Sequence, residues 1–267
     1  MIENFKSNLE RSGLSQNTVS SYVETVRFFL SRYGKVSAET LAEYKTWLID
    51  NYKPKTVNLR IHAMNRYLRY IRKDSYKIKG IKEGGKSSLE NVIGNADYRF
   101  FKRRLKADGC DQAYFAVWFM AATGARISEL LQMKAEHVYV GYVDLYSKGG
   151  KLRRIYFPKA LRKEATGWLK KKGIESGYLF LNRSGQVITP RGMALKLERY
   201  ARKYGIDPKL VHPHAFRHLF AKNFLEKYND ISFLADLLGH ESIETTRIYL
   251  RRTSSEQHEV LDRIVRW

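Results

Sequence analysis

The sequence contains very little cysteine: Cys110 is the only one among 267 residues. A single thiol excludes an intramolecular disulfide and any zinc site built from cysteines, and it fits a reducing compartment. The opening segment 1–13 has no apolar stretch of the signal-peptide kind, and no apolar run in the sequence reaches the length of a membrane span. We therefore expect a cytoplasmic protein with no membrane partner.

Acidic residues are scarce relative to basic ones. Lys and Arg number 49 against 27 Asp and Glu, which gives a formal net charge of +22. This excess is typical of proteins that neutralise phosphates, so it favours nucleic acid as the partner. A ribosome-associated protein, a membrane-surface binder or a merely solvated basic protein would have a similar charge. The hydrophobic content of 43% is sufficient for a substantial core, so disorder is not expected.

Helical periodicity dominates residues 1–76. Apolar residues recur at helical spacing between Ser15, a candidate N-cap, and Gly34, which ends the pattern. A second helix is predicted after Ser37 and a third from Pro54, which together make a small three-helix bundle. The third helix also has a basic face, for which solvation and phosphate binding are equally good explanations. That face consists of Arg60, Arg66, Arg69, Arg72 and Lys73.

The periodicity stops over residues 77–92, which are basic, contain glycine and are poor in apolar residues. We place an interdomain linker there and a second domain over residues 93–267. Segment 137–158 alternates β-prone residues around a Gly-Gly pair, which predicts short antiparallel strands with a hairpin turn. Helical patterns occupy most of the remaining second domain.

Two positions combine an arginine with a setting that suits phosphate. His214 and Arg217 stand three residues apart on a predicted helix, so both side chains lie on one face. A solvent-facing pair on a basic helix would show the same pattern. Arg126 falls in a turn entering a helix, where backbone N–H groups and the helix dipole favour an anion. Glu129 could hold its guanidinium, although an ordinary surface ion pair fits equally well.

Four histidines raise the question of a metal site. They are His212, His214, His218 and His240. None of the usual metal-binding spacings appears, and no acidic residue stands among the three that cluster. We therefore expect neither a metal nor another cofactor.

Four segments in chain order carry a resemblance to a known family. They are ATGARISELL (122–131), YSKGGKLR (146–153), HPHAFRH (212–218) and LLGHESIETTRIYL (237–250). In this order they closely resemble the catalytic domain of the tyrosine recombinases, the family of Xer recombinases and phage integrases. The resemblance extends over essentially the whole chain. It implies a mainly α protein in which a SAM-like helical core-binding domain (1–76) is followed by a mostly helical catalytic domain (93–267) with a small antiparallel β-sheet.

The resemblance assigns six site residues, all present here. They are Arg126, Lys148, His214, Arg217, His240 and the nucleophile Tyr249. Lys151 flanks the same glycine turn and is the alternative to Lys148, which fits the family pattern better. Tyr249 follows His240 by nine residues on a predicted short helix, a setting that the other tyrosines lack. Leu250 and Arg251 depart from the small or polar residues often found after the nucleophile.

The implied function is site-specific DNA recombination through a 3′-phosphotyrosyl intermediate, in integration, excision, inversion or resolution. A phenol with an ordinary pKa of about 10 is a poor nucleophile at neutral pH, so it needs positive charge and a proton acceptor nearby. Arg126 and Arg217 would bind the non-bridging oxygens, and His240 would hydrogen-bond the phosphate. Lys148 would act as general acid and His214 would assist proton transfer.

The implied partners are double-stranded DNA recombination sites and further copies of the chain. The segment 254–267 predicts a capped helix with an apolar stripe, and the family exchanges such a C-terminal helix within a homotetramer on DNA. A type IB-like topoisomerase is the alternative within the same chemistry, but the small N-terminal domain favours a recombinase. A catalytically inert DNA-binding regulator is the other alternative, and the complete set of site residues argues against it.

Overall fold

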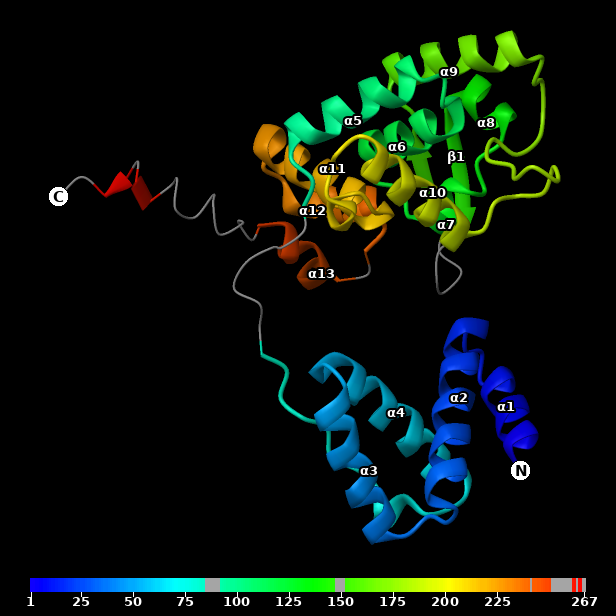
Figure 1. Cartoon of the computed structure of the whole chain (residues 1–267), viewed down its shortest axis with the longest axis vertical. Coiled ribbons are helices and arrows are strands. Elements are labelled where there is room, and N and C mark those ends of the chain that lie inside the picture. Colours follow the sequence, from blue (N-terminus) through cyan, green and yellow to red (C-terminus); the bar gives the residue numbers. More distant parts are fainter. Residues whose placement is uncertain (85–91, 147–151, 241, 251–260, 263, 266–267) are drawn as a thin grey trace. The chain divides into compact units, whose positions relative to one another are not determined.

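A computed structural model of the chain shows two compact, predominantly helical units, Met1–Lys86 and Ser87–Trp267 (Figure 1). The structure describes residues 1–84, 92–146, 152–240, 242–250, 261–262 and 264–265. The predicted fold class, mainly α with a small antiparallel sheet, is confirmed. No helix among these residues is both long enough and apolar enough to cross a membrane.

The N-terminal unit is built from four α-helices and a short 3₁₀ turn over residues 1–84. They are α1 (Ile2–Arg11), α2 (Gln16–Tyr33), α3 (Ala38–Asn51), α4 (Pro54–Tyr70) and η1 (Asp74–Tyr76). The predicted caps are confirmed: the Ser15 hydroxyl accepts from the Thr18 amide, and the Ser37 hydroxyl from the Thr40 amide. The prediction of three helices is wrong by one. It missed α1, which buries only Phe5 and Leu9 and so has a short apolar pattern.

A polar clamp holds the chain that follows these helices against α4. Asn65 Nδ2 donates to the Ile78 carbonyl and its Oδ1 accepts from the Ile78 amide, at 2.9 and 2.8 Å. Asn58 makes the same pair of bonds with Ile81, at 2.9 and 2.8 Å. The two asparagines stand seven residues apart, which places them on one face of the helix. The first residues of the predicted linker are therefore fixed to the N-terminal unit.

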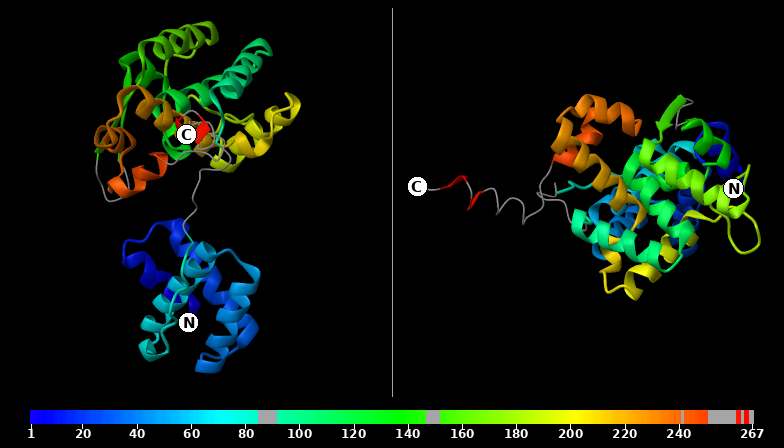
Figure 2. Two further views of the ribbon diagram at one scale, coloured as in Figure 1. Left: turned by 90° about the vertical axis from the view of Figure 1, so that its left-hand side faces the viewer. Right: turned by 90° about the horizontal axis from the view of Figure 1, so that it is seen from above.

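The C-terminal unit is also mostly helical (Figure 2). Its helices are α5 (Asn95–Ala107), α6 (Asp111–Thr123), α7 (Ile127–Leu130), α8 (Ala135–Val140), α9 (Lys159–Lys172), α10 (Pro190–Lys203), η2 (Pro208–Leu210), α11 (Pro213–Tyr228), α12 (Ile231–Leu238), α13 (Ile243–Arg247) and η3 (Ile248–Leu250). Helix α6 is apolar on all sides, and it packs against α5, α9 and α11 in the main core. A smaller apolar cluster joins α11 and α12 to Tyr249.

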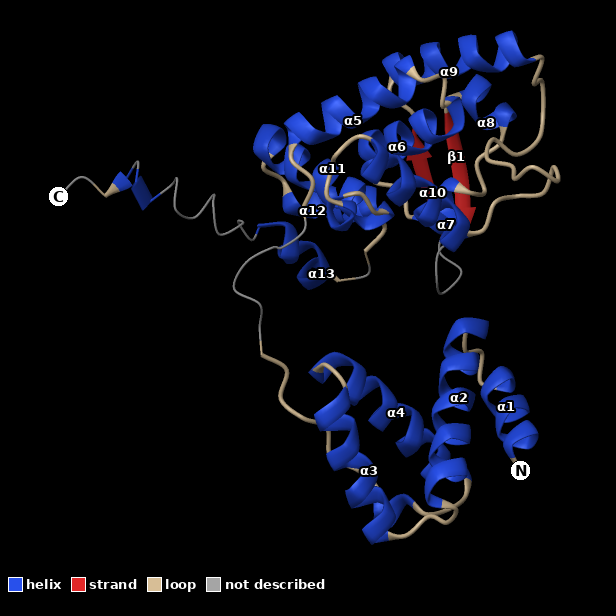
Figure 3. Cartoon of the chain, viewed as in Figure 1, coloured by secondary structure: helices blue, strands red, loops and turns tan. Residues whose placement is uncertain are grey.

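Two antiparallel strands form the sheet of the described chain (Figure 3). Strand β1 (Tyr142–Tyr146) pairs with β2 (Leu152–Tyr156), and Leu145 lies opposite Arg153. The predicted hairpin turn lies outside the described residues. Residues 137–140, predicted as strand, belong to α8 instead. Gly141 ends that helix at φ +100°, a conformation that favours glycine, so the extended backbone begins only at Tyr142.

Candidate active site

Arg217 lies at the centre of the candidate site and is only 3% exposed. It projects from the second turn of α11, whose start is fixed by His212 as N-cap and by a proline at the first helical position. One guanidinium nitrogen donates to the Gly124 carbonyl at 2.7 Å, and the other to the Leu238 carbonyl at 2.8 Å. Burial and the nearby Arg126 lower the pKa of Arg217 to about 10, so it remains charged at neutral pH.

Arg126 is held by Glu129, which was one of the two alternatives that the sequence left open. Its backbone amide donates to Glu129 Oε2 at 2.7 Å and its Nη1 to Oε1 at 2.8 Å. Because Glu129 is only 7% exposed, an ordinary surface ion pair is excluded. The preceding turn depends on Gly124 at φ +64°, where a Cβ would lie 2.6 Å from a ring carbon of Phe220.

A third arginine, Arg153, was missed by the sequence analysis. Its Nη1 donates to Glu129 Oε2 at 2.5 Å, while Nε and Nη2 donate to the Leu237 carbonyl at 3.0 and 2.6 Å. The side chain is 5% exposed, on the same face of β2 as the buried Ile155. One signal in the sequence could have identified Arg153: it is an arginine at an inward-facing strand position, where an apolar residue is expected.

These arginines bind successive backbone carbonyls at the end of α12. Arg153 donates to the carbonyl of Leu237, Arg217 to that of Leu238 and Arg126 to that of Gly239, the last at 3.4 Å. The terminal carbonyls of a helix lack helical partners and carry the negative end of its dipole. The helix end thus fixes all three guanidinium groups.

Glu129 adds a carboxylate to this arrangement. Burial by itself would raise the pKa of Glu129, but the charges and hydrogen bonds of Arg153 and Arg126 outweigh it and hold that pKa below its ordinary value. One carboxylate among three guanidinium groups leaves a net positive charge, and Arg126 keeps a third of its side chain accessible. The cluster is therefore suited to bind an anion such as phosphate.

His240 follows α12 and contacts Arg217 directly. Its Nε2 lies 2.8 Å from Arg217 Nη2, and its Nδ1 lies 2.8 Å from the hydroxyl of the buried Thr246. A guanidinium can only donate, so Nε2 accepts and the ring proton lies on Nδ1. Burial, followed by the charges of Arg217 and Arg126, lowers the pKa of His240 to about 4, so the ring is neutral at neutral pH.

Tyr249 lies in η3, next to this cluster, and is 8% exposed. Its ring stacks on His240 with the centroids 6.1 Å apart and meets His218 edge-on at 4.9 Å. Its phenol also interacts with Arg217, since it raises the pKa of that group against the effect of burial. The predicted nucleophile is therefore a packed side chain beside a fixed cation.

Of the two remaining predicted site residues, the structure describes His214 but not Lys148. His214 is exposed in the first turn of α11, and desolvation, Arg217 and Arg126 lower its pKa. Lys148 and its alternative Lys151 lie outside the described residues. The structure thus connects Arg126, Arg217, His240 and Tyr249, with His214 within electrostatic range of the two arginines. Among the described residues, no group of three or more His, Cys, Asp and Glu side chains could hold a metal ion.

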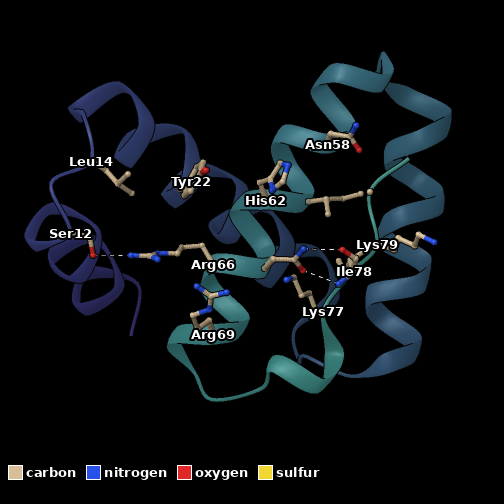
Figure 4. Close-up of a pocket in the computed structure, with 13 residues that line it drawn as sticks. Ser12, Leu14, Tyr22, Asn58, His62, Arg66, Arg69, Lys77, Ile78 and Lys79 are labelled. Carbon is tan, nitrogen blue, oxygen red and sulfur yellow. Dashed lines mark hydrogen bonds between the residues drawn. The ribbon is translucent and has the colours of Figure 1, made fainter. Parts of the chain in front are cut away.

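The N-terminal unit contains a separate basic groove (Figure 4). It has a volume of about 700 Å³ and lies between α4, α2 and residues 77–80. Its polar lining comprises Ser12, Tyr22, Asn58, His62, Asn65, Arg66, Arg69, Lys77 and Lys79. Arg66 crosses the groove to donate to the Ser12 hydroxyl at 2.9 Å. Arg66 and Arg69 belong to the basic face predicted for the third helix.

Comparisons with known proteins define the class of this chain. The model of the phage integrase family matches residues 95–256, more than half of the chain and nearly all of the segment that contains the site. The chain therefore belongs to the phage integrase family. Its activity is that of a tyrosine recombinase, an enzyme of site-specific recombination.

Individual relatives agree with this family. Tyrosine recombinase XerA of Pyrococcus furiosus is 28% identical, with 98% of this chain and 93% of the relative aligned. Tyrosine recombinase XerC of Pseudomonas putida is 32% identical over 61% of this chain and 52% of the relative. The Tn1549 transposon integrase, solved in complex with transposon right end DNA, has a TM-score of 0.73 at 17% identity and covers 98% of both chains. This last similarity concerns the fold.

Proposed function

We propose that this recombinase breaks and rejoins DNA strands with Tyr249 as the nucleophile. The accompanying site residues are Arg126, Lys148, His214, Arg217 and His240. One observation carries the proposal: the buried Tyr249 ring stacks on His240, and His240 is bonded to a guanidinium fixed by two backbone carbonyls. A phosphate bound by Arg217 would therefore lie beside the phenol.

The chemistry follows from these positions. Tyr249 Oη forms a bond to phosphorus while the bond from phosphorus to the 5′ oxygen breaks, which leaves a 3′-phosphotyrosyl link. Arg126 and Arg217 stabilise the additional negative charge of the transition state through preorganised donors. His214, kept neutral by its lowered pKa, accepts the phenol proton, and Lys148 protonates the departing oxygen. Attack by the 5′-hydroxyl of a partner strand reverses the step without ATP.

His240 has a more specific task than a general phosphate contact. Its Nε2 accepts from Arg217 and its Nδ1 proton is directed at Thr246, so the imidazole orients the arginine. When phosphate binds, Nε2 exchanges this partner for a phosphate oxygen and takes up a proton. The anion favours that proton because it opposes the positive charges that lower the pKa of His240.

The partner that we propose is double-stranded DNA carrying a recombination site. The basic groove of the N-terminal unit offers arginine, lysine and histidine donors, side chains that contact phosphates and base edges. We further propose a homotetramer on DNA, assembled by exchange of the C-terminal segment. Leu261, Ile264 and Val265 in that segment are exposed apolar residues available to a neighbouring copy. The site of action is the cytoplasm.

Covalent trapping tests this function. In a pool of randomised nicked duplexes, the short fragment that carries the released 5′-hydroxyl diffuses away after cleavage, so the protein–DNA adduct accumulates and can be recovered under denaturing conditions. We expect an adduct with the wild type and none with Tyr249→Phe. Tyr228→Phe, which removes the hydroxyl of a tyrosine 62% exposed at the end of α11, is the matched control.

The outcomes separate the alternatives. DNA binding with no adduct would indicate an inert regulator. An adduct that persists in Tyr249→Phe would overturn the assigned nucleophile. Relaxation of supercoiled DNA by monomers, without exchange between two selected sites, would indicate a type IB-like topoisomerase.

A further inference from the structure

We propose that Arg153 is a positioning residue of the recombinase site, which links strand β2 to Glu129 and to the end of α12 and thereby fixes Arg126 and His240. The inference rests on the proposed function, since it concerns the same site. Arg153 was not among the residues implied by the family resemblance. It has no assigned contact with DNA, so its action is on neighbouring side chains.

The position of Arg153 is unusual for an arginine. Side chains in this phase of β2 face the core, and Ile155, two residues on, is an ordinary occupant. A guanidinium that is 5% exposed must be desolvated, and its burial is tolerated only with well-placed partners. An aliphatic residue at this inward-facing position would avoid the cost of desolvating a charge. What arginine adds is a rigid fork with donors directed to two separate elements.

The first element is α7, reached through Glu129. Glu129 Oε2 accepts from both Arg153 Nη1 and the Arg126 amide, while Oε1 accepts from Arg126 Nη1. The position of the carboxylate therefore sets the orientation of the Arg126 side chain. Arg153 donates to the same carboxylate oxygen as the Arg126 amide, so loss of Arg153 would free Glu129 and displace Arg126.

The second element is the turn that delivers His240. Arg153 donates twice to the Leu237 carbonyl, and its Cδ packs so closely on Gly239 that a Cβ there would lie 2.6 Å away. Gly239 adopts φ +62°, which also favours glycine. His240 is the next residue. The Arg153 side chain thus supports the backbone from which the imidazole projects.

Strand β2 also follows the hairpin lysine. Arg153 stands five residues after Lys148 in the sequence. Through the hydrogen bonds of Arg153, the described start of β2 is anchored to the elements that carry Arg126 and His240. The bonds of Arg153 to Glu129 and Leu237 explain why a charged side chain, rather than an apolar one, occupies the inner face of the strand.

Single-turnover cleavage of the selected nicked duplex tests the inference. Arg153→Gln should slow formation of the adduct by about 100-fold, the order expected when a small displacement disturbs a reacting geometry, while the Kd for DNA changes by less than about threefold. Arg153→Lys keeps the charge but not the fork, so we expect about a 10-fold loss. Arg154→Gln is the matched control. It removes one charge from the adjacent exposed residue, which pairs with Asp144, and should cleave at the wild-type rate.

A pH profile supplies a readout that a general packing defect would not change. Without Arg153, the Glu129 carboxylate faces Arg126, Arg217 and the neutral ring of His240, and it is more easily protonated. Protonation releases Arg126. The cleavage rate of Arg153→Gln should therefore fall more steeply below neutral pH than that of the wild type.

Each result decides the matter. Wild-type rates and pH profiles in Arg153→Gln, or in Arg153→Lys where the glutamine variant does not fold, would overturn the positioning role. A parallel loss of rate in Arg154→Gln would assign the effect to strand charge instead. Thermal melting identifies unfolded variants. If the wild type itself forms no adduct, the proposed function fails, whereas an adduct that is unaffected by Arg153 refutes only this inference.

Discussion

The arginines of the two units differ in how they are held. On α4, Arg69 has a side chain 61% exposed, and its ion-pair partner Asp74 lies 3.7 Å away, also in solvent. In the C-terminal unit, Arg217 and Arg153 are almost fully buried and bond to backbone carbonyls at 2.6 to 3.0 Å. The exposed group can rotate toward a phosphate, whereas the buried groups already have fixed directions.

This difference corresponds to two kinds of electrostatic work. Exposed cations attract a polyanion over a distance, and salt screens that attraction. Buried donors lose hydration when the protein folds, so no solvent has to reorganise when charge develops on the reacting phosphate. The proposed function therefore assigns the same residue type to affinity in the N-terminal unit and to reaction rate in the C-terminal unit. Substitutions that preserve charge should separate these roles.

The largest effect is expected for Arg217→Lys. Lysine keeps the positive charge but has a single ammonium, which cannot bridge the carbonyls of Gly124 and Leu238 and still bind phosphate bidentately. Single-turnover cleavage should fall by about 1,000-fold, the loss typical when one transition-state donor is removed. The same substitution at Arg66 in the groove should leave the rate at saturating DNA unchanged. If Arg217→Lys cleaves at the wild-type rate, charge alone is sufficient in the buried site.

The buried cluster should also make stability depend on pH. Burial and neighbouring positive charges lower the pKa values of His240 and His218 to about 4. The unfolded chain binds more protons than the folded chain between the ordinary histidine pKa of about 6.5 and pH 4. The stabilising contribution is therefore complete above pH 6.5 and is lost as pH falls through this window.

Urea unfolding of the wild type at pH 7 and pH 5 measures this loss. Because both rings are only partly shielded from solvent, we expect about 2 kcal/mol in total, well below the full value of the shifts. His240→Gln should reduce the pH dependence. His62→Gln, in the groove of the N-terminal unit, should not change it. A pH dependence unchanged by His240→Gln would assign the acid sensitivity to other groups.

Local signals in the sequence were sufficient for much of the fold. The helix starts at Ser15 and Ser37 were predicted because capping involves neighbours within three residues, and both side chains accept the expected amide bond. Residues 137–140 were misassigned because Val and Tyr favour strands intrinsically, whereas tertiary packing and the helix end at Gly141 decide their state.

The site was predictable only where the family motif already marked it. The roles proposed for Arg126 and Arg217 follow from the motif, and Glu129 could be paired with Arg126 because the two share one helical turn. Arg153 donates to Glu129, 24 residues away, and to Leu237, 84 residues away. No periodicity connects such distant positions. Only the folded chain brings the strand and the helix end together.

The smallest effect is expected in the groove, where Arg66→Gln/Arg69→Gln removes two positive charges. Each lost phosphate contact should reduce the slope of log K against log salt by about 1, so the double variant should lose about 2 from that slope. Affinity at low salt should fall about 10-fold, measured by fluorescence anisotropy on the selected duplex, with little change in cleavage at saturation. The matched control is Lys6→Gln/Arg27→Gln, which removes the same charge from positions that do not line the groove. Equal slopes in both double variants would mean that DNA binding depends on net charge and not on the groove. The contrast between the two units would then rest on the buried arginines alone.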